Sequence, residues 1–225
     1  MKVKLQNISP NIEENIVEIA RVSSSRSDKK SKPEGLLNYL IKNKHWSPFE
    51  HGQLTFEIET SKAIGIQLIR HRSFTFQEFS QRYQDVGILD QMFEDIELRK
   101  QCTDNRQSSS EVFNPEWSEI QFGGRYDGEE FTQNGNRAIE DYLVEGKNLY
   151  NKLIHVGVAR EQARMVLPMA TKTRIFMTGS VRSWIHFLEM RDDVHAQKEI
   201  RLLAKDIKNI FKTELPIISN ALSYE

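Results

Sequence analysis

Residues 70–83 have the sequence RHRSFTFQEFSQRY, in which three arginines and a histidine stand beside one glutamate. Four aromatic residues at positions 74, 76, 79 and 83 are interleaved with these polar groups. Guanidinium groups offer forked donors that match phosphate oxygens, and aromatic rings can flank a flat heterocycle. The stretch therefore indicates either a site for a phosphorylated, planar ligand or a solvated helix end followed by a core strand, which is the commoner role of charge runs.

Hydrophobic periodicity on either side of this stretch predicts both strands and helices. Residues 54–59 alternate apolar and polar side chains, as a half-buried strand does, and residues 171–178 form a second candidate strand. Apolar residues recur every three or four positions in further segments, where we expect helices over 11–21, 36–41, 138–156, 160–167 and 193–214. This order of elements favours an α+β fold over a doubly wound α/β fold.

Three helix starts are predicted from residues whose short polar side chains suit an N-cap. Ser61 is expected to begin a helix that runs toward Arg72, and Ser180 one that runs to Arg191. The pair Asp192–Asp193 is expected to cap the last helix and not to bind a metal.

Length and composition favour one domain spanning residues 1–225, with a polar, turn-rich insertion at about 90–137. The 31 basic and 32 acidic residues leave a formal charge of −1, which argues against a general nucleic-acid coat protein. The N-terminus resembles no signal peptide, and no stretch approaches the roughly 18 apolar residues that span a bilayer. We expect a soluble protein of the cytoplasm, or of a host cytoplasm if a virus encodes it.

Cysteine and histidine usage excludes two further classes of site. The lone Cys102 cannot form an internal disulfide, and without a paired base it is more often incidental than a nucleophile. The six histidines make no short ligand motif, so no metal site is expected.

A second set of arginines occurs in the C-terminal third, at positions 160, 164, 174, 182 and 191. Arg160 and Arg164 are four residues apart and share a helical face. A half-buried arginine is costly without an anionic partner, and too few carboxylates stand nearby to pair all five. Anionic ligands would satisfy them.

The pattern Arg70-His71-Arg72, seven residues, Ser80 resembles the signature of the flavin-dependent thymidylate synthases, the ThyX family. Other motifs similar to those of this family occur in the same order, over roughly 1–85 and 145–215. They are ARVS (20–23), PFEH (48–51), REQARMVLP (160–168), RSWIHFL (182–188) with Arg191, and AQ and EI within 196–200. Several ordered motifs are far more specific than one short pattern.

The resemblance implies an α+β fold with a central, largely antiparallel sheet flanked by helices, assembling as a homotetramer with shared active sites. It implies reductive methylation of dUMP to dTMP, with 5,10-methylenetetrahydrofolate as the carbon donor. The hydride comes from FAD reduced by NADPH, so the reaction needs no cysteine nucleophile and the cofactor supplies the difficult step. No nucleic acid or membrane partner is implied.

The resemblance also assigns roles to individual residues. The FAD-binding set is Ser23, His51, Arg70, His71, Arg72, Glu78, Ser180 and His186. The dUMP-binding set is Gln67, Arg70, Glu78, Ser80, Gln81, Arg82, Arg164 and Arg191, with Arg82 and Arg164 near the phosphate. Ser180 and His186 stand where many relatives have asparagine, and Gln81 replaces a common glycine.

Arg191 and Ser80 are the candidate catalytic residues. Arg191 is expected to contact the pyrimidine and to stabilise an enolate-like anion, as an oxyanion-hole donor does. Ser80 is expected to bind the ligand through its hydroxyl, because the sequence shows no base that would activate it as a nucleophile.

Two other functions fit part of the pattern. A module for RNA or nucleotides would use the arginines and aromatic residues of 70–83, and its binding would be sensitive to salt. An architectural oligomer would pair its arginines across subunits and bind no cofactor. Both leave the ordered C-terminal motifs unexplained.

Overall fold

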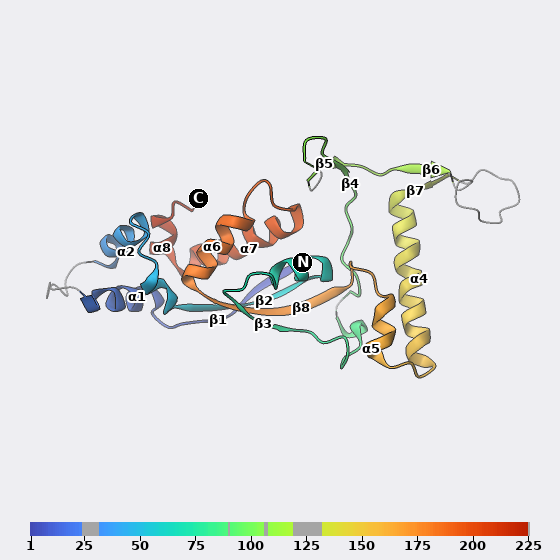
Figure 1. Ribbon diagram of the computed structural model, residues 1–225, viewed down its shortest axis with the longest axis horizontal. Helices are drawn as coiled ribbons and strands as arrows, with labels where there is room; N and C mark the ends of the chain where they lie inside the picture. Colours follow the sequence, from blue (N-terminus) through green and yellow to red (C-terminus); the bar gives the residue numbers. More distant parts are fainter. Residues whose placement is uncertain (24–31, 90, 106–107, 119–131, 225) are drawn as a thin grey trace, which may run out of the picture. The chain divides into compact units, whose positions relative to one another are not determined.

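The computed structural model describes residues 1–23, 32–89, 91–105, 108–118 and 132–224 (Figure 1). The chain divides into two compact units. Unit 1 comprises residues 1–60, 64–78 and 174–225, and unit 2 comprises residues 61–63 and 79–173. Each unit has its own buried apolar centre, so each is held by its own packing. The prediction of a single domain with an insertion stays a prediction.

A four-stranded sheet in the order β1-β2-β8-β3 forms the base of unit 1. Its strands are β1 (Lys2–Ile8), β2 (Gln53–Ser61), β8 (Lys172–Ser180) and β3 (Thr75–Glu78). β1 pairs antiparallel with β2, and β3 pairs antiparallel with β8. The predicted antiparallel sheet is therefore confirmed for both outer pairs.

The central pair, β2 and β8, also runs in opposite directions, as two side-chain contacts show. Thr55, near the start of β2, contacts Thr178, near the end of β8, with 2.9 Å between the hydroxyl oxygens. Glu59, near the end of β2, accepts a hydrogen bond of 2.6 Å from Arg174, near the start of β8. The whole sheet is thus antiparallel.

Helices cover the apolar face of this sheet. The alternation predicted for 54–59 is confirmed, because Leu54, Phe56 and Ile58 are buried while the residues between them are partly exposed. Figure 1 shows α6 and α7 above the sheet. The helices of unit 1 are α1 (Ile12–Ala20), α2 (Pro33–Lys42), α6 (Val181–Arg191), α7 (Lys198–Glu214) and α8 (Pro216–Ala221), with 3₁₀ turns η1 (Arg21–Ser23) and η2 (Ser47–Glu50).

Trp184 joins α6 to the sheet. Its ring is fully buried, and its indole N–H donates to the carbonyl oxygen of Leu54 over 3.1 Å. Phe56, Phe74 and Phe187 pack against it in edge-to-face geometry, with ring centroids 4.6–5.5 Å apart. A buried indole that lacked its acceptor would be costly, so the hydrogen bond fixes the orientation of α6 as well as its distance.

Unit 2 packs a long helix against short elements. Its helices are α4 (Gly135–His155) and α5 (Arg160–Ala163), with 3₁₀ turns η3 (Val86–Ile88) and η5 (Arg164–Val166). Two antiparallel pairs lie in the predicted insertion: β4 (Arg99–Gln101) with β5 (Ser109–Val112), and β6 (Glu116–Ser118) with β7 (Thr132–Asn134). The buried centre is formed by Val86, Tyr150 and Ala163.

Several helix boundaries differ from prediction, and the helix expected over 160–167 is α-helical only to Ala163, after which the chain forms the 3₁₀ turn η5. α3 (Lys62–Leu68) begins directly after Ser61 but ends four residues before Arg72, because the chain then turns to bury His71 and Phe74. The last long helix begins at Lys198, so the prediction that Asp193 caps it is wrong. Asp193 instead accepts a hydrogen bond from the backbone N–H of His195 in a turn.

The predicted cap at Ser180 is confirmed. Ser180 caps α6, since its hydroxyl accepts from the backbone N–H of Ser183 over 3.2 Å.

Strand β1 and helix α8 were not predicted. Within the residues described, no helix has the length and apolar character required to cross a membrane.

Gly179 is required because the backbone of β8 passes close to a ring. A Cβ atom at this position would lie 2.4 Å from Cδ1 of Phe74, which is itself packed against Trp184. We predict that Gly179→Ala lowers the free energy of unfolding by about 1–3 kcal/mol through overpacking. Urea titration followed by circular dichroism measures it.

Gly35→Ala is the matched control, since a Cβ at Gly35 in α2 would meet nothing within 4 Å. This variant should gain up to about 1 kcal/mol, because alanine is the better helix former. Equal stability of the two variants would contradict the role given to the close approach at Phe74.

Candidate functional site

The C-terminus of α6 meets the turn that follows α3 at a hydrogen bond between Arg191 and His71. Nε of Arg191 donates to Nε2 of His71 over 2.9 Å. The imidazole is buried and packs edge-on against Phe74 and Phe187. Because His71 accepts through Nε2, its own proton must reside on Nδ1.

The charge state of this pair follows from its burial. The pKa of His71 is lowered to about 4, mainly by burial and to a smaller extent by the nearby charges of Arg191 and His186. Burial also lowers the pKa of Arg191, although a guanidinium remains a cation at neutral pH. The pair is therefore a neutral acceptor that holds a fixed cation.

Arg191 keeps donors available for a ligand. In the part of the chain that the structure describes, Nε is its only nitrogen with a hydrogen-bond partner. Its two terminal nitrogens can therefore present a planar pair of N–H groups to an oxygen that carries negative charge.

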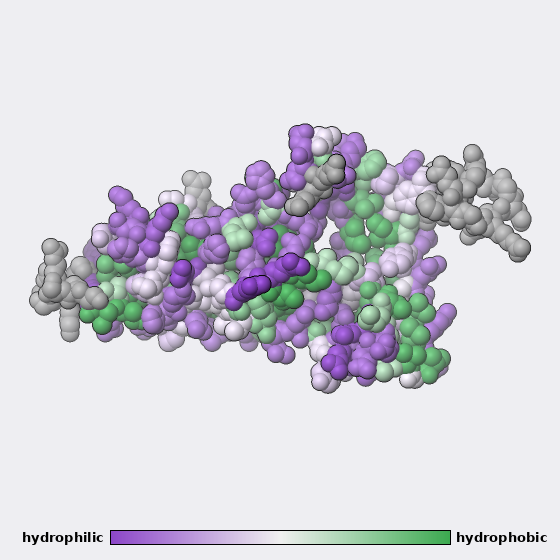
Figure 2. Space-filling view, viewed as in Figure 1, coloured by the Kyte–Doolittle hydropathy of each residue, from purple (hydrophilic) through white to green (hydrophobic). Residues whose placement is uncertain are grey.

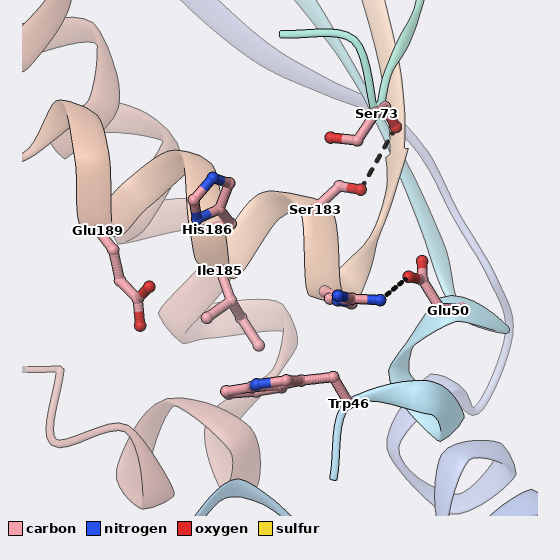
Figure 3. A pocket seen from close by; sticks show the side chains of 8 residues that line it. Trp46, Glu50, Ser73, Ser183, Ile185, His186 and Glu189 are labelled. Atoms are coloured by element: carbon pink, nitrogen blue, oxygen red, sulfur yellow. Dashed lines mark hydrogen bonds and ion pairs between the residues drawn. The ribbon is translucent and has the colours of Figure 1, made fainter. Parts of the chain in front are cut away.

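A pocket of about 400 Å³ opens beside α6 (Figure 3). Figure 3 shows His186 and Glu189 on the helix, with the ring of Trp46 below Ile185. Ser183 donates from its hydroxyl to the backbone oxygen of Ser73 over 3.3 Å, which ties α6 to the turn after His71. The pocket is lined by Trp46, Glu50, Ser73, Arg182, Ser183, Ile185, His186 and Glu189.

Glu50 orders one wall of this pocket. It accepts a hydrogen bond of 2.6 Å from the Ser180 hydroxyl and one of 2.7 Å from Arg182. The hydrogen bond from Ser180 is the main reason that the pKa of Glu50 is lowered, with Arg182 adding to it. An ionised Glu50 thus connects the start of α6 to η2.

All eight residues predicted to bind FAD belong to unit 1. His71, Ser180 and His186 lie along or against α6. Arg70, Arg72 and His51 are exposed, and Glu78 is half-buried at the end of β3. The backbone of Ser23 ends η1, but its side chain lies outside the described residues.

The residues predicted to bind dUMP divide between the two units. In unit 1, Gln67 donates to the side-chain oxygen of Gln197 over 2.6 Å. Four others, Ser80, Gln81, Arg82 and Arg164, belong to unit 2. Arg82 and Glu161 form an exposed ion pair of 3.4 Å, which is too solvated to hold Arg82 firmly.

Two buried side-chain N–H donors of unit 2 lack an acceptor within the described part of the protein. They are Nε2 of Gln81 and Nε of Arg164. An unsatisfied buried donor costs about 1–3 kcal/mol, so an acceptor from a ligand or a water would stabilise both. Both residues belong to the set predicted from the sequence.

Sequence reasoning gave no individual role to Glu50, Arg182 or Gln197. All three lie within the family motifs quoted above, and this position in a motif was the sequence signal that could have identified them. Their pairing was not visible, because Glu50 and Arg182 are 132 residues apart and Gln67 and Gln197 are 130 apart. No group of three metal-binding side chains occurs among the residues that the structure describes.

Residues 4–217 match the family model described as thymidylate synthase complementing protein. The chain is 38% identical over 213 residues to a protein of Paramecium bursaria Chlorella virus 1 named as a probable flavin-dependent thymidylate synthase, covering 94% of this chain and 91% of that protein. It is 38% identical over 206 residues to the flavin-dependent thymidylate synthase of Synechocystis, covering 91% and 86%. It is 34% identical over 201 residues to that of Thermosipho africanus, covering 89% and 81%.

The neutral state of His71 predicts a pH dependence of stability. Its pKa is lowered from 6.5 to about 4, so between these values the unfolded chain binds a proton that the folded chain does not. The contribution of His71 to stability is therefore present above pH 6.5 and is lost as the pH falls toward 4. The slope of the unfolding free energy should approach about 1.4 kcal/mol per pH unit for one proton.

His71→Asn should remove this component, which urea unfolding at a series of pH values would measure. Met190→Ala on the exposed side of α6 is the control, because it changes the same helix without removing a titrating group. If the wild type and His71→Asn showed the same slope between pH 4 and 6.5, the neutral imidazole would be the wrong description.

Proposed function

The chain belongs to the flavin-dependent thymidylate synthases, and on this basis we propose that it methylates dUMP to dTMP. The carbon comes from 5,10-methylenetetrahydrofolate, and NADPH reduces the FAD. The single observation that carries the proposal is the family match over residues 4–217, in which the motifs recur in order. The Arg191–His71 hydrogen bond supports the proposal, because it brings the motif around residues 70–72 into contact with the motif that ends at Arg191.

The residues of unit 1 fit a flavin nucleotide by the chemistry of their donors. Exposed Arg70 and Arg72 offer guanidinium groups suited to a diphosphate, and the pocket beside α6 presents the imidazole of His186. Ser180, at the start of α6, and His51, after η2, complete this set in the proposal, together with Ser23, His71 and Glu78. When bound, FAD supplies the hydride that the methyl transfer requires.

The residues proposed for dUMP fit a ligand that carries a phosphate. The unpartnered Nε atom of Arg164 and Nε2 atom of Gln81 are donors that a phosphate or carbonyl oxygen would satisfy. Arg82 can leave its exposed pair with Glu161 at little cost. Ser80 contributes a binding hydroxyl, and Gln67 an amide oriented by Gln197.

Arg191 is the proposed electrostatic catalyst. Charge develops on a pyrimidine oxygen when the ring becomes an enolate-like anion at C5, and a fixed guanidinium stabilises that charge. His71 holds Arg191 without neutralising it, because a neutral imidazole accepts the Nε–H and leaves the terminal nitrogens unpaired. The proposal gives no role to Cys102, which is half-buried after β4.

We extend the proposal to a homotetramer with shared active sites, acting in the cytoplasm, with no nucleic acid or membrane partner. Support for shared sites comes from the exposure of His51, Arg70 and Arg72, which leaves these cations open to a ligand or a second subunit. The single-stranded RNA module remains the second candidate only through the exposed arginines and Tyr83.

The visible spectrum of the purified protein tests the function. We expect the absorption of an oxidised flavin, release of FAD on denaturation, and oxidation of the reduced flavin that depends on dUMP and methylenetetrahydrofolate. A colourless protein that cannot be reconstituted with FAD, or one that binds single-stranded RNA with strong salt sensitivity, would remove the proposal.

Arg191→Ala should lower kcat about 10²–10³-fold, the usual cost of removing one oxyanion-stabilising donor. FAD content and the midpoint of urea unfolding should change little by comparison, and dTMP formation measures the rate. Arg137→Ala is the control, since Arg137 is an exposed arginine that pairs with Asp141 on α4. Unchanged kcat in Arg191→Ala would remove the role given to Arg191.

A further inference from the structure

Arg191 stands in the sequence EMRDD (residues 189–193), which brings three carboxylates close to a single cation. Glu189 and Asp193 are exposed, so solvent screens their charges, and hydrophilic residues predominate on the surface around the turn between α6 and α7 (Figure 2). The side chain of Asp192 is only 16% exposed, so its charge is screened least. A carboxylate in this place would oppose any anion that Arg191 binds.

Asp192 also stands at the end of α6, where the helix dipole disfavours a negative charge. It is the C-cap of the helix, and its backbone N–H donates to the carbonyl oxygen of Leu188 over 2.9 Å. The carbonyl groups of the last turn carry partial negative charge, so a carboxylate beside them needs a cation. Arg191 is not that cation, because burial lowers its pKa, whereas a carboxylate in contact with the guanidinium would raise it.

Lys208, on α7, supplies the cation. Its ammonium nitrogen lies 3.0 Å from Oδ2 of Asp192, and its side chain is 24% exposed. The same ammonium stands over the ring of Tyr224, 4.6 Å from the ring centroid. The phenol of Tyr224 stays neutral, because its pKa is raised mainly by burial and to a smaller extent by the charges of Glu189 and Asp192. The ammonium is therefore held from two sides, and the anion it pairs with is Asp192.

We propose that Lys208 compensates the charge of Asp192 and thereby keeps the C-terminal end of α6 favourable to an anion. Lys208 is then a positioning residue, which acts through the surroundings of Arg191 and not by contact with the ligand. This role rests on the proposed function of Arg191 as an electrostatic catalyst, and it adds a residue of a second helix to the catalyst. It explains how an arginine flanked by three carboxylates can still stabilise negative charge.

An ion pair of this kind can also serve only to hold α7 against α6. Breaking the pair would lower stability in either case, so stability does not separate the two roles. Charge compensation instead predicts that the two partners have unequal effects. Removal of the ammonium leaves a bare carboxylate next to Arg191, whereas removal of the carboxylate leaves a bare ammonium, which favours an anion.

The rate of dTMP formation tests this difference. Lys208→Met should lower kcat about tenfold, because the bare carboxylate of Asp192 opposes the charge that develops on the pyrimidine. KM for dUMP should change little, since the pyrimidine is neutral in the ground state. Asp192→Asn alone should not lower kcat, and the variant with both changes should recover most of the rate lost in Lys208→Met.

Two further variants serve as controls for the loss of the lysine. Lys208→Arg keeps a cation over the ring of Tyr224 and should retain most of the activity. Lys205→Met removes the same charge from an exposed position of α7 and should leave kcat and KM unchanged.

The pKa of His71 gives a second reading that needs neither FAD nor dUMP. Its imidazole accepts from Nε of Arg191, so it senses the same surroundings. The pKa is lowered to about 4, mainly by burial and then by the charges of Arg191 and His186. A bare carboxylate at Asp192 favours the imidazolium, so this pKa should rise in Lys208→Met and return when Asp192→Asn is added. Nuclear magnetic resonance of the imidazole over a pH series measures it, with His71→Asn assigning the signal.

Equal losses of kcat in Lys208→Met and Asp192→Asn would overturn the proposal, and so would a pKa of His71 that is the same in wild type and Lys208→Met. Circular dichroism shows whether each variant is folded. If Lys208→Met does not fold, Asp192→Asn still decides, because a fall in its kcat contradicts compensation. If no FAD binds but the pKa of His71 shifts as expected, the enzymatic proposal fails and the compensation of Asp192 stands.

Discussion

The packing of Trp184 is the interaction on which the site in unit 1 depends. Its hydrogen bond to Leu54 and its contacts with Phe74 and Phe187 join β2, α6 and the turn after α3 in one buried group. Because rings in such a group interdigitate at crystal-like density, α6 has little freedom to slide or rotate. Both ends of α6 are therefore fixed, and these ends carry Ser180 and Arg191. The same burial removes water from His71, and its low pKa follows from that.

The charges around α6 follow from this geometry. At the helix start, Ser180 and Arg182 donate to an ionised Glu50 and order the pocket wall. At the helix end, a neutral His71 holds Arg191 without cancelling its charge. A carboxylate in place of His71 would neutralise the guanidinium and reduce its value to an anionic ligand. The site thus contains the Glu50–Arg182 ion pair, which orders the pocket wall, and the Arg191 guanidinium, whose charge stays available to an anionic ligand.

The sequence predicted the elements whose signals are local. The alternation in 54–59 and the cap at Ser180 depend on neighbours a few residues away, and the structure confirms both. The start of α7 was placed too early, because Asp193 forms a turn that local propensity does not distinguish from a cap. The pairing of Glu50 with Arg182 depends on 132 intervening residues, so no window along the chain contained it. Family resemblance selected most of the candidate residues, while only three-dimensional packing assigned Glu50 a partner.

In unit 2, the burial of one guanidinium nitrogen decides what the turn η5 can bind. The Nε atom of Arg164 is buried and has no hydrogen-bond partner among the described residues. An unsatisfied buried donor costs about 1–3 kcal/mol, so a ligand oxygen that accepts from this nitrogen would remove a cost that the folded turn otherwise carries. Because such a ligand binds the folded turn and not the unfolded chain, its binding would also stabilise unit 2. The same buried donor would thus contribute both to ligand affinity and to the stability of the turn that holds it.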